Sequence, residues 1–581
     1  MFPQAALRGC SAYNQPVVHP FFSSRSGWLQ RLTAPVLLTF APALFIAVSA
    51  RAQNVAPEPA TGGNGRILLV LPFDNRTGQP SLEWIREASA EILGSRLASA
   101  GFAPMSRADR IYALDHLGLP QGFQPSRASA LKLAETLDAD SIIVGSYITD
   151  GSGIVAEGQV VDVPHLRISQ RLTARGEMRN LITVFDTLAW ELARQLDPGF
   201  VVSQETFVSA DSGLRLDAFE QYIRGITESD QAERLLHLKS AVALSPELSQ
   251  AWMALGREQF AGEQYEQAAQ AFAKVRSNDA DALEAGFFRG LCLLYFGDYT
   301  RAEEAFAGVA RVLPLAEVLN NEGVALARGG KDGTPYFLQA ESADPSGADY
   351  HFNLAVSLKR HGDAAEALTE LGQYLRLRPN DSEALALQKA WTEPTRPAAS
   401  RAALTAMPTA AGAGATGEDA EAKADPLERI ERGFDAVAFH QAALMLDQMN
   451  ATRLAALGTH ERAQRLSTQA KEYLDRGMLL EAERLYQDAV AADPKVAEAH
   501  AGLAEIRQRT GDKEAARKEA VTSLELMPSV EAYLVMGRLN LAANHIYEAR
   551  QEVEAGLKID PASTALLELR GQIEAREGQK Q

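Results

Sequence analysis

Cysteine is nearly absent from this chain of 581 residues, which holds only Cys10 and Cys292. Cys10 lies in a segment that we expect to be removed, and Cys292 falls at an inner position of an expected helix. So few cysteines exclude a disulfide framework and a cysteine metal site. We therefore expect Cys292 to be a small core residue.

Basic charge is also scarce. The chain has 57 lysines and arginines against 75 aspartates and glutamates, and its formal net charge is −18. Because contacts with phosphate need a basic face, this balance argues against a nucleic-acid partner. We expect the acidic side chains to form a solvated surface, and the partners to be proteins or peptides.

The chain lacks the short motifs of common enzyme classes. Gly330-Lys331 is followed by Asp332, so no phosphate loop is formed. The ten histidines are scattered without metal-ligand spacing, and no nucleophile elbow is present. We therefore predict no catalytic residue, no metal, no cofactor and no enzymatic activity.

The first 65 residues predict a secretory leader rather than a folded domain. Three arginines precede the apolar run Leu32 to Ala50, and the run ends at a small-x-small site. This order predicts a signal peptide over residues 1–52, cleaved after Ala52, and a flexible lead-in over 53–65. We expect a secreted, periplasmic protein with no stable membrane span after cleavage. The alternative is an inner-membrane anchor, since the run is long enough to cross a bilayer.

Residues 66–200 combine strand and helix patterns. The expected strands cover residues 67–71, 102–105, 141–148, 154–163 and 166–174. The expected helices cover residues 82–100, 107–117, 127–137 and 178–196. A hairpin signal, Asp150-Gly151-Ser152-Gly153, joins two of the strands. This order predicts an α+β domain in which helices cover a mixed sheet.

Two polar residues, Asp74 and Asn75, follow the first expected strand. Side chains at strand ends of open α/β sheets often bind ligands, so a ligand-sensing or enzymatic α/β domain regulated by the rest of the chain is the alternative function. Asp and Asn in turns also bond to their own backbone. We favour the turn.

Two stretches of this domain carry a resemblance to known proteins. They are LVLPFDN at residues 69–75 and ADSIIVGS at residues 139–146. Through them the domain resembles the amino-terminal domain of the Tol–Pal translocation protein TolB and the domains of FlgO-like and CsgG-like envelope proteins. The resemblance implies an envelope role in binding or assembly, and it brings no catalytic residues.

From residue 215 onward, the pattern is that of paired helices with a period of about 34 residues. In its clearest copy the markers are Trp252, Leu255 and Gly256 on the first helix, and Ala268 and Phe272 on the second. Prolines that end helices recur at Pro246, Pro314, Pro345, Pro379, Pro494, Pro528 and Pro561. This pattern resembles that of tetratricopeptide-repeat proteins. Since one helix pair cannot bury its own apolar face, the copies are expected to stack into a solenoid.

The repeats form two blocks. The first covers residues 215–391 with about five repeats, and the second covers 460–575 with about three repeats and a closing helix. Residues 392–426 between them have no apolar period and are expected to be disordered. Residues 427–459 show an amphipathic pattern that starts at Phe434, and we expect a connecting helix that caps the second block. The predicted fold is thus an α+β domain followed by an all-α solenoid in two blocks.

The first helices of the first block are expected to line a concave groove. By the repeat pattern, the residues facing it are Met253, Arg257, Phe260, Phe287, Leu291, Leu294, Tyr295, Phe352, Val356 and Lys359. An apolar, partly aromatic groove suits a short peptide or a partner helix. The alternative is that several of these residues pack against the first domain or the next helix.

One repeat subclass clamps a terminal carboxylate with Lys and Asn at fixed places on successive first helices. In the third and fifth repeats we assign these places to Phe287 and Leu291, and to Phe352 and Val356. A chaperone-tail receptor is therefore not expected. The sequence predicts instead a non-enzymatic periplasmic scaffold that holds protein or peptide partners in an envelope assembly or transport complex.

Overall fold

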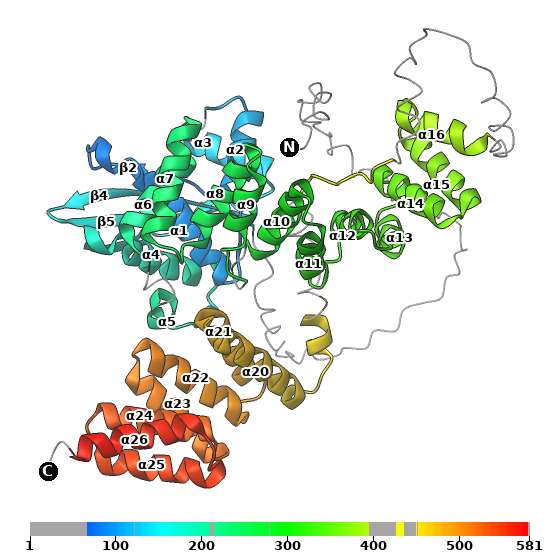
Figure 1. The fold of residues 1–581 in the computed structure, drawn as a ribbon. Helices are drawn as coiled ribbons and strands as arrows, with labels where there is room; N and C mark the ends of the chain where they lie inside the picture. The colour runs from blue at the N-terminus through cyan, green and yellow to red at the C-terminus, as the bar shows by residue number, and fades with distance from the viewer. Residues whose placement is uncertain are drawn as a thin grey trace, which may run out of the picture. The chain divides into compact units, whose positions relative to one another are not determined.

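The computed structural model describes residues 67–120, 122–209, 214–277, 279, 281–393, 426–434, 449 and 451–578 (Figure 1). The expected signal peptide, the lead-in and nearly all of the expected disordered linker lie outside these residues. The described chain forms an α/β domain and two helical blocks. None of the described helices is long and apolar enough to cross a membrane.

The α/β domain is built on a mixed sheet, as predicted. Its strands are β1 (Ile67–Val70), β2 (Asp74–Asn75), β3 (Ala103–Pro104), β4 (Ser141–Asp150), β5 (Gly153–Asp162), β6 (Arg167–Ile168) and β7 (Leu172–Glu177). β1 pairs in parallel with β3 and β4, whereas β4 and β5 form an antiparallel hairpin. β2 pairs with β4, and β6 and β7 both pair with β5.

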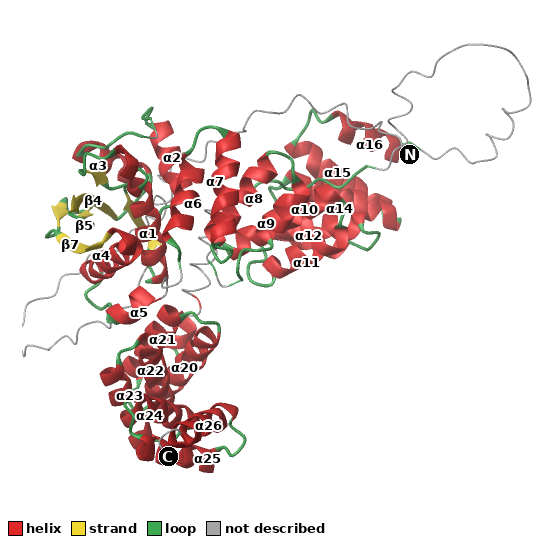
Figure 2. Ribbon diagram, turned by 60° about the vertical axis from the view of Figure 1, so that its left-hand side comes forward, coloured by secondary structure: helices red, strands yellow, loops and turns green. Residues whose placement is uncertain are grey.

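Helices cover both faces of this sheet (Figure 2). They are α1 (Ile85–Ser99), α2 (Arg107–His116), α3 (Arg127–Thr136) and α4 (Leu181–Leu196). Leu68 and Val70 pack in one core cluster with residues of α1 and α4. Leu69 and Leu71 pack in another with residues of α2 and α3. The alternation follows from the period of two in a strand, which sends successive side chains to opposite faces.

One expected strand, residues 166–174, is divided into β6 and β7. Ser169 still pairs with β5, because its N–H donates to the Val160 carbonyl (2.8 Å) and its Oγ accepts from the Val160 N–H (3.0 Å). The next pair is Leu172 with Gly158. The register therefore shifts by one residue across Gln170-Arg171, which is a β-bulge.

The first helical block consists of consecutive helix pairs and a final helix. Its helices are α6 (Leu216–Thr227), α7 (Gln231–Leu244), α8 (Ser249–Ala261), α9 (Tyr265–Phe272), α10 (Ala282–Phe296), α11 (Tyr299–Ala310), α12 (Ala316–Arg328), α13 (Thr334–Ala343), α14 (Ala348–His361), α15 (Ala364–Leu377) and α16 (Ser382–Thr392). The short helix α5 (Gln204–Ser209) precedes the block.

Close helix contacts explain the glycines of the repeat pattern. A Cβ atom on Gly256 would lie 2.7 Å from the ring of Phe272. At Gly290 the corresponding distance to the ring of Phe306 is 2.6 Å. The small residue on the first helix thus makes room for the aromatic residue on the second, which is the physical basis of the motif.

The second block repeats this design with the helices α20 (Thr459–Asp475), α21 (Leu479–Ala492), α22 (Ala497–Thr510), α23 (Lys513–Leu526), α24 (Val530–Ala542), α25 (Ile546–Ile559) and α26 (Thr564–Gly578). The expected connecting helix over 427–459 is wrong in its first part. Residues 427–434 have no helical structure, and residues 435–448 lie outside the described chain. Within 427–434, the main chain of Arg429 and Glu431 bonds to side chains of the first block.

Candidate functional site

Residues 426–434, here called the groove segment, lie against the first block. In Figure 1 the segment is the yellow stretch of chain. Its partners come from α10, α12, α14, α15 and the start of α16, far back in the sequence. The expected groove on the first helices is therefore occupied by a later part of the same chain.

Two asparagines hold the main chain of the segment. Asn353 on α14 donates from Nδ2 to the Arg429 carbonyl (2.7 Å) and accepts the Arg429 N–H on Oδ1 (2.6 Å). Asn321 on α12 does the same for Glu431, at 2.7 Å and 2.9 Å. Each amide side chain offers a donor and an acceptor. It therefore replaces the neighbouring strand that an extended segment would pair with in a sheet.

A third asparagine joins the two. Asn320 accepts from Asn353 Nδ2 (2.8 Å) and donates to the Arg429 carbonyl (3.2 Å). All three asparagine side chains have an exposed fraction of 0%. Since buried polar groups need hydrogen-bond partners, the segment satisfies amides that the repeats alone would leave open.

Repeat geometry explains why the two clamps match the segment. Asn321 lies two residues before Gly323, and Asn353 lies two residues before Ala355, so both take the same place on successive first helices. The residues they hold, Glu431 and Arg429, are two apart. Alternate residues of an extended chain direct their main-chain groups to the same side. Because the earlier repeat holds the later residue, Glu431, the segment runs opposite to the order of the repeats.

Glu428 lies in a basic pocket beside the clamps. Its exposed fraction is 3%, and its carboxylate contacts Arg360 and lies 3.7 Å from Nε of Arg328. The two arginines also donate to main-chain carbonyls, Arg328 to Glu428 (2.5 Å) and Arg360 to Pro426 (2.9 Å). The pocket thus fixes both the charge and the backbone of this part of the segment.

Arg429 enters an acidic, aromatic slot. Its guanidinium carbon lies 3.9 Å from the ring centre of Phe352 and 4.7 Å from that of Tyr374. Nη2 donates to Asp381 (3.1 Å) and to Glu383 (3.0 Å), and Nη1 contacts the Tyr374 hydroxyl. Stacking on rings combined with forked hydrogen bonds is a property of arginine that lysine lacks.

The pKa values in this slot favour a charged Asp381 and a neutral Tyr374. Burial alone would raise the pKa of Asp381. The N–H of Ala384, the Tyr374 hydroxyl and Arg429 outweigh burial, and the pKa is lowered. Burial and the hydrogen bond to Asp381 both raise the pKa of Tyr374. Arg429 therefore meets a carboxylate over the whole neutral pH range.

Aromatic residues receive the end of the segment. The ring of Phe434 lies 5.5 Å from that of Phe287 and 5.8 Å from that of Phe288, measured between centres. Arg432 is exposed and lies over Tyr295 at 5.5 Å. Ile430 packs against the core cluster of the first block that contains Phe287. The groove is thus amide-lined and charged at one end and apolar at the other.

Three of the ten residues that we expected to face the groove contact the segment: Phe287, Tyr295 and Phe352. Buried in the cores of the repeats, with exposed fractions of 2% or less, are Met253, Leu291, Leu294 and Val356. The remaining three contact neighbouring side chains. Phe260 contacts the ring of Tyr295, Arg257 pairs with the carboxylate of Glu284, and Lys359 lies over the ring of Trp391.

Sequence reasoning missed the asparagines and the two arginines of the basic pocket. A signal for the clamps exists, because Asn321 and Asn353 hold the same repeat position. The signal is hidden because the fourth repeat is short and because the places of the carboxylate clamp, Phe352 and Val356, lie on either side of Asn353. The clamp also differs from the carboxylate clamp of the chaperone-tail receptors, since it holds internal main chain and not a chain end.

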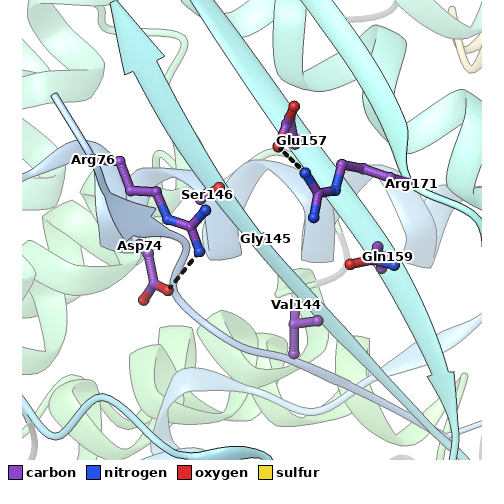
Figure 3. A pocket seen from close by; sticks show the side chains of 8 residues that line it. All are labelled: Asp74, Arg76, Val144, Gly145, Ser146, Glu157, Gln159 and Arg171. Carbon is purple, nitrogen blue, oxygen red and sulfur yellow. Dashed lines mark hydrogen bonds and ion pairs between the residues drawn. The ribbon is translucent and has the colours of Figure 1, made fainter. Parts of the chain in front are cut away.

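The α/β domain has a small polar cavity on its sheet (Figure 3). Its volume is about 130 Å³, and it is lined by Asp74, Arg76, Val144, Gly145, Ser146, Glu157, Gln159 and Arg171. Arg171 donates to Glu157 (3.1 Å), and Arg76 lies 3.9 Å from Asp74. Ligand pockets commonly hold about 300–1,000 Å³. The cavity is small for a ligand, and each arginine already faces a carboxylate.

Asn75 forms the turn that we favoured. Its Oδ1 accepts the N–H of Thr77 (3.0 Å), two residues on, and its Nδ2 donates to the Gln79 carbonyl (3.1 Å). Cys292 is fully buried, and burial raises the pKa of its thiol to about 12. Within the described ranges, no group of three or more potential ligands is placed to hold a metal.

Comparison with known proteins identifies the repeats. A tetratricopeptide-repeat family model matches residues 253–314, 331–382 and 467–525. The expected tetratricopeptide repeats are therefore confirmed in both blocks. A search of curated proteins gives no match.

Several solved structures are similar to parts of the chain. YrrB, a TPR protein with an unusual peptide-binding site, is 18% identical over 35% of this chain and 99% of that chain, with a TM-score of 0.26. MamA from Desulfovibrio magneticus RS-1 is 21% identical over 29% and 100%, with a TM-score of 0.27. The LpoB C-terminal domain from Salmonella enterica is 22% identical over 20% and 84%, with a TM-score of 0.18. At these TM-scores the likenesses carry no conclusion about function.

Proposed function

We propose that this protein is a non-enzymatic repeat scaffold that binds extended segments of partner proteins along the groove of its first block. The observation that carries the proposal is the pair of amide clamps, in which Asn321 and Asn353 each bond twice to one residue of the groove segment. Such a clamp recognises main chain, so it accepts an extended segment of any protein that fills the neighbouring side-chain pockets.

A crosslinking pulldown with the full mature chain tests the proposal. The test variant carries Asn321→Ala and Asn353→Ala. The matched control is Asn540→Ala, because Asn540 is also buried but accepts from Arg517 (2.8 Å) in the second block. We expect the double variant to lose its partners and the control to keep them. Retention of the same partners by a double variant with intact circular dichroism would contradict the proposal, as would the absence of any partner.

We also propose that the chain is secreted into a bacterial periplasm and acts there in an envelope assembly. Support comes from the predicted signal peptide over residues 1–52 and from the resemblance of residues 66–200 to envelope proteins. In this proposal the α/β domain locates the scaffold within the assembly. Amino-terminal sequencing of the protein from a periplasmic extract should find Gln53 as the first residue. An uncleaved amino terminus would contradict secretion in this form and favour the inner-membrane anchor.

A further inference from the structure

The contacts of the groove segment also define what a partner must look like. Resting on the proposed function, we propose that the groove selects extended segments in which an acidic residue is directly followed by arginine. We propose further that the groove segment is a built-in competitor that such partners displace. The argument uses the charges of two adjacent pockets and the covalent attachment of the segment to the block.

The first pocket demands an acid. Arg328 and Arg360 face the carboxylate of Glu428, which is buried with an exposed fraction of 3%. A neutral residue at this position would leave two partly buried guanidinium groups without their counter-charge. Removing one partner of a buried ion pair is strongly unfavourable, so an occupant without an acid here binds much more weakly.

The second pocket demands arginine. Phe352 and Tyr374 stack on the guanidinium of Arg429, and the carboxylates of Asp381 and Glu383 accept its hydrogen bonds. The carboxylate of Asp349 lies 3.6 Å away. A lysine would keep the charge and lose both the planar stacking and the forked bonds.

The order of the two residues matters as much as their identity. Arg328 and Arg360 lie on the Glu428 side, and three carboxylates lie on the Arg429 side. Exchanging the two residues would place an arginine among arginines and a glutamate among carboxylates. Composition and net charge would stay the same, yet every charge contact would become repulsive. This exchange is therefore a matched control for specificity.

The remaining positions restrict a partner less. Leu427 has an exposed fraction of 66%, and Arg432 and Gly433 are also exposed. Glu431 is held through its main chain, and Ile430 and Phe434 contact apolar and aromatic residues. The pattern read from the groove is thus acid, arginine and aliphatic in sequence, followed by an aromatic residue four positions after the aliphatic one.

The groove segment competes because it belongs to the same chain. Asparagine clamps, ion pairs and ring contacts are interactions that a free peptide of the same sequence can also make. An attached occupant has a high effective concentration, so it fills the groove more often than a free peptide does. The apparent affinity for an external partner is reduced by the fraction of molecules whose groove is open.

The test uses a fluorescein-labelled peptide with the sequence of residues 426–434 and fluorescence anisotropy on the full chain. The released variant carries Glu428→Arg and Arg429→Glu in its own segment. The clamp-less variant carries in addition Asn321→Ala and Asn353→Ala. A second peptide has its glutamate and arginine at positions 428 and 429 exchanged.

We expect the peptide to bind the released variant about tenfold or more tightly than the unmodified chain. We expect the exchanged peptide to bind the released variant about tenfold or more weakly, and the clamp-less variant to lose binding. Equal binding to the unmodified and released chains would overturn the proposal that the groove segment competes with partners. Equal binding of the two peptides would overturn the selectivity. No binding to the released variant would contradict the proposed function itself.

A measurement on the unmodified chain covers the case in which the released variant does not fold. Hydrogen–deuterium exchange is followed at residues 426–434 of the chain, with and without an excess of the unlabelled peptide. If the peptide displaces the segment, exchange of the chain's own residues becomes faster. Unchanged exchange at a peptide concentration that saturates binding would overturn the proposal that partners displace the groove segment.

Discussion

The two repeat blocks share one fold, and one repeat position separates their surfaces. Two residues before the small residue at the helix crossing, the third to fifth repeats carry Phe288, Asn321 and Asn353. The corresponding residues in the second block are Thr468, Gly502 and Val535. Amides at this position hold an extended main chain in the first block. The repeat fold therefore supplies a surface, and this position decides whether the surface can clamp a peptide backbone.

In the second block Gly502 at this position serves helix packing. A Cβ atom on Gly502 would lie 2.1 Å from the ring of Tyr486, which is itself 2% exposed. The aromatic ring thus occupies the space in which a side chain would stand. We infer that Gly502 contributes to stability at this place, whereas Asn321 and Asn353 serve recognition.

The largest effect is predicted for a variant that gives the first block the residue pattern of the second. Asn321→Thr with Asn353→Val removes the amides and keeps residue types that the second block carries. Four main-chain hydrogen bonds are lost, each worth about 1 kcal/mol net. In a chain whose own segment is released, the peptide of residues 426–434 should bind about 100-fold or more weakly by fluorescence anisotropy. Unchanged affinity would show that the amides are not what separates the blocks.

The next effect is on the second block alone. Gly502→Ala should destabilise it by about 1–3 kcal/mol, because the added methyl group meets the buried ring of Tyr486. Gly571→Ala is the control, since no atom lies within 4 Å of its Cβ position. Hydrogen–deuterium exchange of α21 and α22 measures the opening. Equal protection in the two variants would contradict the packing role.

A smaller effect depends on pH. His500 Nδ1 lies 2.7 Å from Glu519, and Nε2 lies 3.0 Å from the Pro494 carbonyl. Both ring nitrogens face acceptors, and the hydrogen bond to Glu519 is the main cause that raises the pKa of His500. In the first block His351 makes the same two contacts, with Glu370 (2.7 Å) and with the Pro345 carbonyl (3.0 Å). In the second repeat Trp252 takes this place and donates to the Pro246 carbonyl (2.9 Å).

The direction of the pH dependence follows from the raised pKa of His500. The stabilisation by His500 is fully present below its unfolded pKa, near 6.5, and is lost as pH rises through the higher folded value. Protection of α22 and α23 from hydrogen exchange should therefore fall as pH rises above about 6.5, after correction for the intrinsic rate. Glu519→Gln should lower stability at pH 6 by about 1 kcal/mol and flatten the profile. An unchanged profile in that variant would exclude this pair as its source.

The smallest expected effect is an absence of reaction. Cys292 lies buried on α10, and burial raises the pKa of its thiol to about 12. Because the thiolate is the reactive form, a thiol reagent should label Cys292 only when the first block opens. Mass spectrometry of the native chain at pH 8, with a urea-unfolded sample as the control, should show no label there. Rapid labelling in the native chain would mean that the core around α10 opens readily.

Local patterns were enough to predict the α/β domain and the repeats. The continuous apolar run Leu68 to Leu71 marks a strand buried on both faces, and the pairing of Gly256 with Phe272 marks a helix crossing. Such signals come from residues close in sequence or at a fixed repeat distance. The bulge after Ser169 escaped prediction because a one-residue change of register leaves the alternation almost intact.

The occupied groove could not be predicted in the same way. Glu431 and Asn321 are 110 residues apart, and the pattern around Phe434 read alone favours a helix. The main chain of Arg429 and Glu431, just before Phe434, bonds to amides of α14 and α12, and no local pattern predicts these contacts. The repeated position of Asn321 and Asn353 was visible in the sequence, but the length change in the fourth repeat hid their equivalence.

Residue-resolved hydrogen exchange on the full chain tests the amide clamp most directly. The N–H groups of Arg429 and Glu431 donate to Asn353 and Asn321, so both should exchange slowly. Asn353→Ala should remove most of the protection at Arg429, Asn321→Ala should do so at Glu431, and Asn540→Ala should affect neither. Fast exchange at both N–H groups in the unmodified chain would show that the first block does not hold an extended main chain.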